Sequence, residues 1–262
     1  MLNITDPAEA RKIIRADKYD KQTAGIAGKY VQGNLCILPS KYALDFAAFC
    51  QKNPKPCPLI GFGVKGDPYL KDLGDIDIRT DVPRYKIWQN GKTIDEPTNI
   101  KKYWNDDLVT FVLGCSMSFE LPLMEAGIEM QHIKNNTTVP MYKTNIDCVP
   151  AGPFKGKLVV SMRPLNAEDT IKAIQISSRF PAVHGAPIHL GDPAQIGIKD
   201  IMKPEYGDAP RAIKNNETPV FWACGVTPQS VVENCKPDFC ITHKPGAMLI
   251  TDKLNSSLAA IN

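Results

Sequence analysis

The segment from residue 107 to residue 127 constrains the fold of this chain more than any other. Its apolar, β-branched run Leu-Val-Thr-Phe-Val-Leu ends abruptly at Gly114-Cys115-Ser116, and a sequence that favours a helix follows. In α/β proteins, an apolar strand, a tight glycine turn and a helix start present reactive side chains and free backbone N–H groups at the end of a strand. We therefore expect a strand, a turn and a helix N-terminus beside a ligand.

The same construction recurs at residues 219–229. There the run Pro-Val-Phe-Trp-Ala precedes Cys224-Gly225, and a helix is expected near Ser230. Because the N-terminus of a helix attracts anions, two such turns suit a small substrate with two carboxylates, and they favour an enzyme over a plain binding module. The residues expected to bind the substrate at the two turns are Gly114, Ser116, Cys224, Gly225 and Thr227.

Charge and hydropathy argue against two classes of partner. The 262 residues carry a formal net charge of +3 without a block of lysine or arginine, so nucleic acid is not an expected partner. No apolar run approaches the ~20 residues that span a bilayer, and the first residues lack the basic and apolar regions of a signal peptide. We expect a cytoplasmic protein that does not bind membranes; a homodimer is left open.

The eight cysteines are expected to be free thiols. They are spread over the chain without a CxxC pair, which is unlike a zinc site, and disulfides are rare in cytoplasmic proteins. Cys115 and Cys224 differ from the others because each lies at an expected helix N-terminus, where a thiolate is stabilised.

The order of the expected elements predicts two kinds of structure. Strands and helices alternate toward both ends of the chain, which favours α/β structure there. The middle of the chain, beginning with residues 127–133, is rich in strand-like patterns and favours α+β structure. We expect an α/β plus α+β fold, namely a mixed-sheet α/β sandwich with a smaller α+β part.

The domain boundaries follow from the return of strand, turn and helix near the C-terminus. The larger α/β domain is expected to be discontinuous and to combine residues 1–127 with residues 216–262. The smaller α+β domain is expected to comprise residues 128–215. In this division, strand 219–223 belongs to the same sheet as strand 108–113.

Two histidines are candidates for proton transfer. His184 lies with His189 in a loop rich in proline and glycine, but their spacing of five residues fits neither a shared helix face nor a metalloprotease helix. His243 follows an apolar strand. Since histidine titrates near neutral pH, each could be a general acid or base; each could equally be a structural residue that hydrogen-bonds to the backbone.

Charged residues near the expected strand and helix ends are candidates for binding and catalysis. Arg163 ends an apolar strand, and Arg179 follows a helix; arginine suits the capture of a carboxylate by two hydrogen bonds. Glu120 lies in the first turn of the helix after Cys115, where it could take part in catalysis or only complement the helix dipole.

Several longer strings extend these patterns over nearly the whole chain. They are Gly114-Cys-Ser-Met-Ser-Phe-Glu120, Val139-Pro-Met-Tyr-Lys-Thr-Asn145, Val159-Val-Ser-Met-Arg-Pro164, Ser178-Arg-Phe-Pro-Ala-Val-His-Gly-Ala-Pro187, Trp222-Ala-Cys-Gly-Val-Thr-Pro-Gln229 and Thr242-His-Lys-Pro-Gly246, with residues 53–58 and 77–83 in addition. Together they resemble the D-glutamate cyclase family, formerly grouped as uncharacterised hydro-lyases. Met117 stands where the family is expected to have an aromatic residue, and Gly33 where it is expected to have alanine.

The resemblance implies a two-part fold and the conversion of D-glutamate to 5-oxo-D-proline with loss of water. Closing this lactam requires a neutral amine, a protonated or polarised γ-carboxyl group and a hydroxide that leaves as water. Direct attack is chemically simpler than a thioester through Cys115 or Cys224, because a thioester would require activation of a carboxylate without ATP. We expect His243 or His184 to move protons, turn N–H groups to hold the oxyanion, and Arg163 to anchor the α-carboxylate.

The residues expected to be catalytic are thus His243, His184, Glu120 and Cys115. Arg163, His184, His243 and the turns at Cys115 and Cys224 are expected to meet in one pocket. A small carboxylate is the expected partner, and no cofactor is expected, although a divalent metal is left open. Two alternatives stay open beside the cyclase. One is a non-catalytic binding or regulatory protein of oxoproline metabolism, and the other is a dehydratase for another small amino or hydroxy acid.

Overall fold

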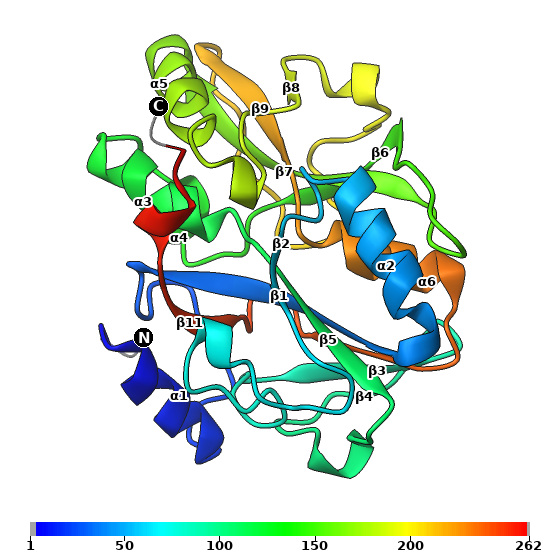
Figure 1. Cartoon of the computed structure of the whole chain (residues 1–262). Coiled ribbons are helices and arrows are strands. Elements are labelled where there is room, and N and C mark those ends of the chain that lie inside the picture. Colours follow the sequence, from blue (N-terminus) through cyan, green and yellow to red (C-terminus); the bar gives the residue numbers. More distant parts are fainter. Residues whose placement is uncertain (1–3, 261–262) are drawn as a thin grey trace.

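Two antiparallel sheets share one core in the computed structural model, which describes residues 4–260 (Figure 1). The helices are α1 (Pro7–Arg15), α2 (Ser40–Lys52), α3 (Met117–Glu125), α4 (Gln131–Lys134), α5 (Ala167–Ser177) and α6 (Thr227–Cys235). The strands are β1 (Tyr30–Pro39), β2 (Leu59–Phe62), β3 (Tyr85–Gln89), β4 (Lys92–Asp95), β5 (Leu108–Leu113), β6 (Met141–Asp147), β7 (Lys157–Asn166), β8 (His189–Leu190), β9 (Glu217–Ala223), β10 (Cys240–His243) and β11 (Leu249–Leu254).

The larger sheet has seven strands in the order β2-β5-β1-β10-β3-β4, with β11 also paired to β1. β1 is its central strand: residues 34–39 pair with β5, and on the opposite side β11 and β10 follow each other along β1. Its side chains alternate between two cores, as a strand that is buried on both faces requires. Cys36 and Leu38 contact the core that both sheets share, whereas Leu35 and Ile37 contact a second core on the far face of the larger sheet.

The smaller sheet has four strands in the order β6-β7-β9-β8. β9 pairs with β7 over seven residues, so the strand expected at 219–223 lies in a different sheet from the strand at 108–113. The expected boundary at residue 216 is therefore wrong for this strand, because the chain returns to the larger sheet only at β10. The ends of the expected larger domain, residues 1–3 and 261–262, lie outside the described residues.

Helices pack on both sheets, and the expected combination of helix and sheet is confirmed. α2 and α6 border the shared core, whereas α3 and α5 pack together against the other face of the smaller sheet. The expected mixture of parallel and antiparallel strands is wrong, since every strand pairing among residues 4–260 is antiparallel. The segment expected as strand at 127–133 ends in the short helix α4. In this described part of the chain, no helix has the length and apolarity that crossing a membrane demands.

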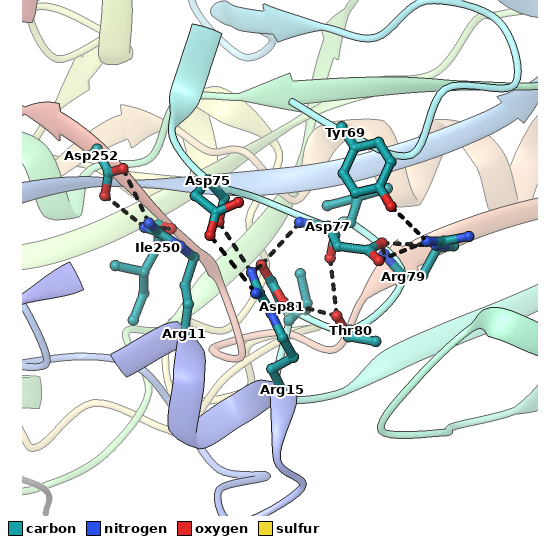
Figure 2. A network of polar contacts seen from close by, with 12 residues as sticks. Arg11, Arg15, Tyr69, Asp75, Asp77, Arg79, Thr80, Asp81, Ile250 and Asp252 are labelled. Carbon is teal, nitrogen blue, oxygen red and sulfur yellow. Dashed lines mark hydrogen bonds and ion pairs between the residues drawn. The ribbon is translucent and has the colours of Figure 1, made fainter. Parts of the chain in front are cut away.

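Arginines of α1 attach this helix to the larger sheet through a network of carboxylates (Figure 2). Arg11 is buried and donates to the Ile250 carbonyl and to Asp252 of β11, at 3.1 Å in each case. Arg15 makes two hydrogen bonds to Asp81, with Nε and Nη2 at 2.8 and 2.7 Å from its oxygens. Asp81 also accepts from the Thr80 hydroxyl at 2.9 Å and is fully buried.

We expect Asp81→Ala to lower the free energy of unfolding by about 2 kcal/mol, because it removes two hydrogen bonds of Arg15 and the 2.9 Å hydrogen bond of the Thr80 hydroxyl. Asp75→Ala is the matched control. Its carboxylate lies 3.8 Å from Arg15 and its side chain is 91% exposed, so the expected change is within about 0.5 kcal/mol. Urea unfolding of the two variants measures the difference, and equal losses would contradict the structural role of Asp81.

Candidate functional site

A cleft lies where the turn between β5 and α3 meets the turn between β9 and α6. We call it the inner cleft; its volume is about 80 Å³. Its wall includes Cys115 and Ser116 of the first turn, Cys224 and Gly225 of the second turn, and the two histidines His184 and His243. The two turns and both histidines that the sequence singled out therefore line the same cleft.

Asn34 of β1 holds the two turns together. Its Nδ2 donates to the Gly114 carbonyl at 2.9 Å, which fixes the end of β5. On the other side Asn34 packs so closely on Gly225 that a Cβ atom there would lie 2.1 Å from Asn34 Nδ2. Glycine is required at 225 for this approach, and the asparagine sets the distance between the two helix N-termini.

His243 faces the inner cleft with a fixed tautomer. Its Nδ1 accepts a hydrogen bond from the Leu35 amide at 3.1 Å, so the proton of the neutral ring is on Nε2. Its own carbonyl accepts from Gln229 of α6 at 3.1 Å, which fixes the end of β10. Within residues 4–260 no acceptor pairs with Nε2–H, so His243 offers the cleft a hydrogen-bond donor.

His184 has the opposite tautomer. Its Nδ1 lies 2.6 Å from the Lys55 carbonyl, and because a carbonyl can only accept, Nδ1 carries the proton. Nε2 then keeps a lone pair, and no donor among the described residues forms a hydrogen bond to it. His184 lines the cleft. The backbone of His184 is left-handed, with φ 85°. His243 thus offers the cleft a donor and His184 an acceptor.

Burial keeps both histidines neutral. It lowers the pKa of His184 and that of His243 from 6.5 to about 4, and each side chain belongs to a residue that is 1% exposed. At neutral pH the His184 Nε2 lone pair is therefore available as a base. His243 can polarise an oxygen by hydrogen bonding without carrying a charge.

These pKa values predict that acid destabilises the protein. Since the folded-state pKa of each histidine lies below its value in the unfolded chain, the unfolded state binds more protons between about pH 6.5 and 4. Stability is full above pH 6.5 and falls as the pH is lowered, by at most about 3 kcal/mol per histidine.

Urea unfolding at neutral pH and at about pH 5 measures the change before carboxylates titrate. The double variant His184→Asn/His243→Asn should lose most of this dependence, and a wild-type stability that is constant in this range would contradict the burial of neutral histidines.

The cysteines of the two turns are thiols and not the expected thiolates. Burial raises the pKa of Cys115 and raises the pKa of Cys224 to about 12. The Met117 amide lowers the pKa of Cys115, and the Val226 amide lowers the pKa of Cys224. Desolvation, which raises both pKa values, is the larger effect. A neutral thiol is a poor nucleophile, so the geometry favours a role for the turn backbone over a covalent role for the sulfur.

Arg163 is engaged by the protein itself. Its guanidinium forms a buried ion pair with Glu120 of α3 and donates to the hydroxyls of Ser161 and Ser116, at 3.1 Å each. The guanidinium also stacks on an aromatic ring, with its carbon 5.3 Å from the Trp222 ring centroid. Arg163 therefore lies behind the cleft, and its expected role as a free anchor for a carboxylate is wrong.

Glu120 is ionised by the same contact. Although burial opposes its charge, Arg163 and His132 together hold the pKa of this carboxyl well below its usual range. Glu120 Oε1 lies 3.4 Å from His132 Nε2 and from the Ser116 hydroxyl. The carboxylate thus positions Arg163 and His132 and cannot supply a proton at neutral pH.

Three other expected substrate-binding residues are used elsewhere. Arg179 is exposed and does not line the cleft; its backbone carbonyl accepts from Ala260. The Thr227 hydroxyl is buried and donates to the Cys224 carbonyl at 2.7 Å, which closes the turn before α6. The Gly114 amide donates to the Pro58 carbonyl at 2.7 Å, so it is not free for a substrate. The expectations for Thr227 and Gly114 are wrong because backbone carbonyls occupy their donors, and the expectation for Arg179 is wrong because it lies outside the cleft.

Two residues of the site were not expected from the sequence. His132 of α4 lines the inner cleft, and Asn34 spans the two turns. Asn34 could have been found as a polar residue directly before the apolar run at residues 35–39, which is unusual for a strand that is buried on both faces. His132 is one of only four histidines, but its segment carries no motif. No group of three or more metal-binding side chains is assembled within residues 4–260.

The comparisons with known proteins identify the family. A family model described as D-glutamate cyclase matches residues 109–252. A Pelagibacter ubique protein, provisionally named a hydro-lyase, is 78% identical over 261 residues and covers 100% of both chains. A Bordetella pertussis protein with the same provisional name is 59% identical over 253 residues, which are 96% of this chain and 91% of that protein.

These relatives make the chain a member of a hydro-lyase family. That family is the D-glutamate cyclase family, to which the chain belongs, and the resemblance of the sequence motifs is confirmed. Among solved structures, a nitrogen repressor-like protein from Methanococcus jannaschii matches with 8% identity and a TM-score of 0.36, over 83% of this chain and 86% of that chain. That score is too low to carry an argument.

Proposed function

We propose that this hydro-lyase converts D-glutamate to 5-oxo-D-proline and water in the inner cleft. The observation that carries the proposal is the pair of neutral histidines with opposite tautomers, His184 as acceptor and His243 as donor, beside two helix N-termini. Lactam formation needs one base for the amine proton and one donor for the carbonyl oxygen. The family's description supports the choice of substrate.

The substrate carboxylates would bind through the helix N-termini. The amides of Met117, the first residue of α3, and of Val226, the residue before α6, donate to no backbone carbonyl in the described chain and point toward the cysteine of their own turn. Partial positive charge at a helix N-terminus stabilises an anion without a cationic side chain. This matters here because no lysine or arginine lines the inner cleft within the described residues.

Ring closure would proceed by direct attack. The neutral amine attacks the carbon of the protonated γ-carboxyl group, and a bond from nitrogen to carbon forms. His184 Nε2 takes a proton from the attacking nitrogen and transfers it to the departing hydroxyl, which leaves as water. His243 Nε2–H stabilises the carbonyl oxygen while negative charge builds on it. Holding glutamate folded makes the attack intramolecular, which removes much of the entropic barrier.

Two alternatives remain for the same site. A binding or regulatory protein of oxoproline metabolism would hold glutamate or 5-oxoproline without turnover. A dehydratase for another small amino or hydroxy acid would use the same base and donor on a different carbon. The two fixed tautomers favour an enzyme. A site that only binds its ligand does not require a buried histidine base whose lone pair has no hydrogen-bond donor.

We expect purified protein to form 5-oxoproline from D-glutamate and not at a comparable rate from L-glutamate. Chromatography with and without added divalent metal measures the product. The Cys115→Ala variant should retain activity within about tenfold, since the turn backbone and not the thiol supplies the donors. Absence of product from both enantiomers, and of the reverse reaction, would contradict the proposal; tight binding without turnover would support the regulatory alternative.

A further inference from the structure

A second, larger cleft opens directly from the inner one. This outer cleft has a volume of about 250 Å³, roughly three times that of the inner cleft. The two share wall residues from α3 and the α4 segment, among them Met117, Glu120 and His132. Any molecule that reacts beside the histidines therefore has free space continuous with its reacting end.

The wall of the outer cleft is mainly apolar. Met117, Leu121 and Met124 line it from α3, and Ile133 and Tyr30 line it from α4 and β1. Met124 and Ile133 remain 37% and 41% exposed, which is unusual for large apolar side chains that lie together at a concave surface. An apolar group in the cleft would cover them.

Free glutamate does not match this space. Its carboxylates would bind at the helix N-termini of the inner cleft, which would leave the larger outer cleft empty. The ionised Glu120 lines both clefts and does not distinguish them, whereas the mainly apolar wall is particular to the outer cleft. The chemistry of the wall fits a substrate with an apolar group attached to the end that reacts.

We propose that the enzyme also cyclises glutamate whose γ-carboxyl group carries an apolar amide, with the apolar group bound in the outer cleft. The proposal rests on the proposed lactam chemistry and extends it to a second class of leaving group. The α-amine nitrogen forms a bond to the γ-carbonyl carbon, and the bond from that carbon to the amide nitrogen breaks. His184 carries the proton from the attacking nitrogen to the leaving nitrogen, and the products are 5-oxoproline and a free amine.

Two matched substrates test the proposal on the full-length protein. D-glutamic acid γ-benzylamide places an aromatic ring in the outer cleft, whereas the γ-methylamide leaves the cleft empty. Burial of the ring should raise kcat/KM for the benzylamide at least about tenfold over the methylamide. Formation of 5-oxoproline and release of the amine are measured together, because cyclisation yields equal amounts of both.

Gly28 allows the outer cleft to be filled without disturbing the fold. It lines the outer cleft and not the inner one, a Cβ atom there meets nothing within 4 Å, and its backbone is not left-handed. The Gly28→Leu variant should reduce the ratio of benzylamide to methylamide rates to near one. Met124→Trp fills the same space from α3 and provides a second variant should the first fold poorly.

The outcomes separate this proposal from the proposed function. A benzylamide preference that both filling variants abolish supports it. Equal rates for the two amides, or a preference that survives both variants, would overturn it. Turnover of D-glutamate without turnover of either amide overturns it while the D-glutamate cyclase activity stands. Turnover of the benzylamide without turnover of D-glutamate supports the amide class and contradicts the proposed conversion of D-glutamate.

Discussion

Arg163→Ala is expected to lower the free energy of unfolding by about 3–5 kcal/mol, because it leaves a buried carboxylate without its partner. The affected carboxylate is Glu120, which is 5% exposed and ionised in the folded protein. The truncation also removes the guanidinium that stacks on Trp222 and Phe119. Urea unfolding at neutral pH measures the loss.

A double variant separates the lost charge pair from lost packing. Arg163→Met with Glu120→Gln removes both charges and keeps most of the side-chain volume, so we expect it to recover much of the stability that Arg163→Ala loses. The competing interpretation, in which Arg163 anchors the substrate, predicts an increased KM and little loss of stability. A loss below about 1 kcal/mol together with a large increase in KM would therefore contradict the structural role assigned to Arg163.

Much of the cleft could be predicted from the sequence. Patterns of strand, glycine turn and helix are local, so the turns at Cys115 and Cys224 were recognisable, and both end in the inner cleft. His184 and His243 were also found, because His184 lies in a loop rich in proline and glycine and His243 follows an apolar strand. In each case the signal depends on neighbours in sequence.

The parts that could not be predicted depend on contacts between distant residues. β9 belongs to the smaller sheet because it pairs with β7. The sequence of an apolar strand does not indicate which sheet it joins, because that depends on the side chains that pack on its two faces. The pairing of Arg163 with Glu120 joins residues 43 positions apart. Burial also decides the pKa of Cys224, and it reverses the effect expected from a helix N-terminus alone.

Replacing either His184 or His243 by asparagine is expected to lower kcat by about 10²–10⁴ with little change in stability. Asparagine can keep the structural hydrogen bond of each ring while removing Nε2. At position 184 its amide N–H replaces Nδ1–H toward the Lys55 carbonyl, and asparagine tolerates the left-handed backbone there. At position 243 its carbonyl oxygen replaces Nδ1 as the acceptor for the Leu35 amide.

His189→Asn is the matched control, because His189 contacts the Asp192 carbonyl outside the inner cleft and its loss should leave kcat unchanged. Steady-state kinetics with D-glutamate and urea unfolding of each variant together distinguish catalysis from folding. A reduced kcat with an unchanged KM and unchanged stability assigns proton transfer to His184 and oxyanion stabilisation to His243. If both asparagine variants stay active while Cys115→Ala is inactive, the reaction is covalent, and the neutral thiol must then be deprotonated when substrate binds.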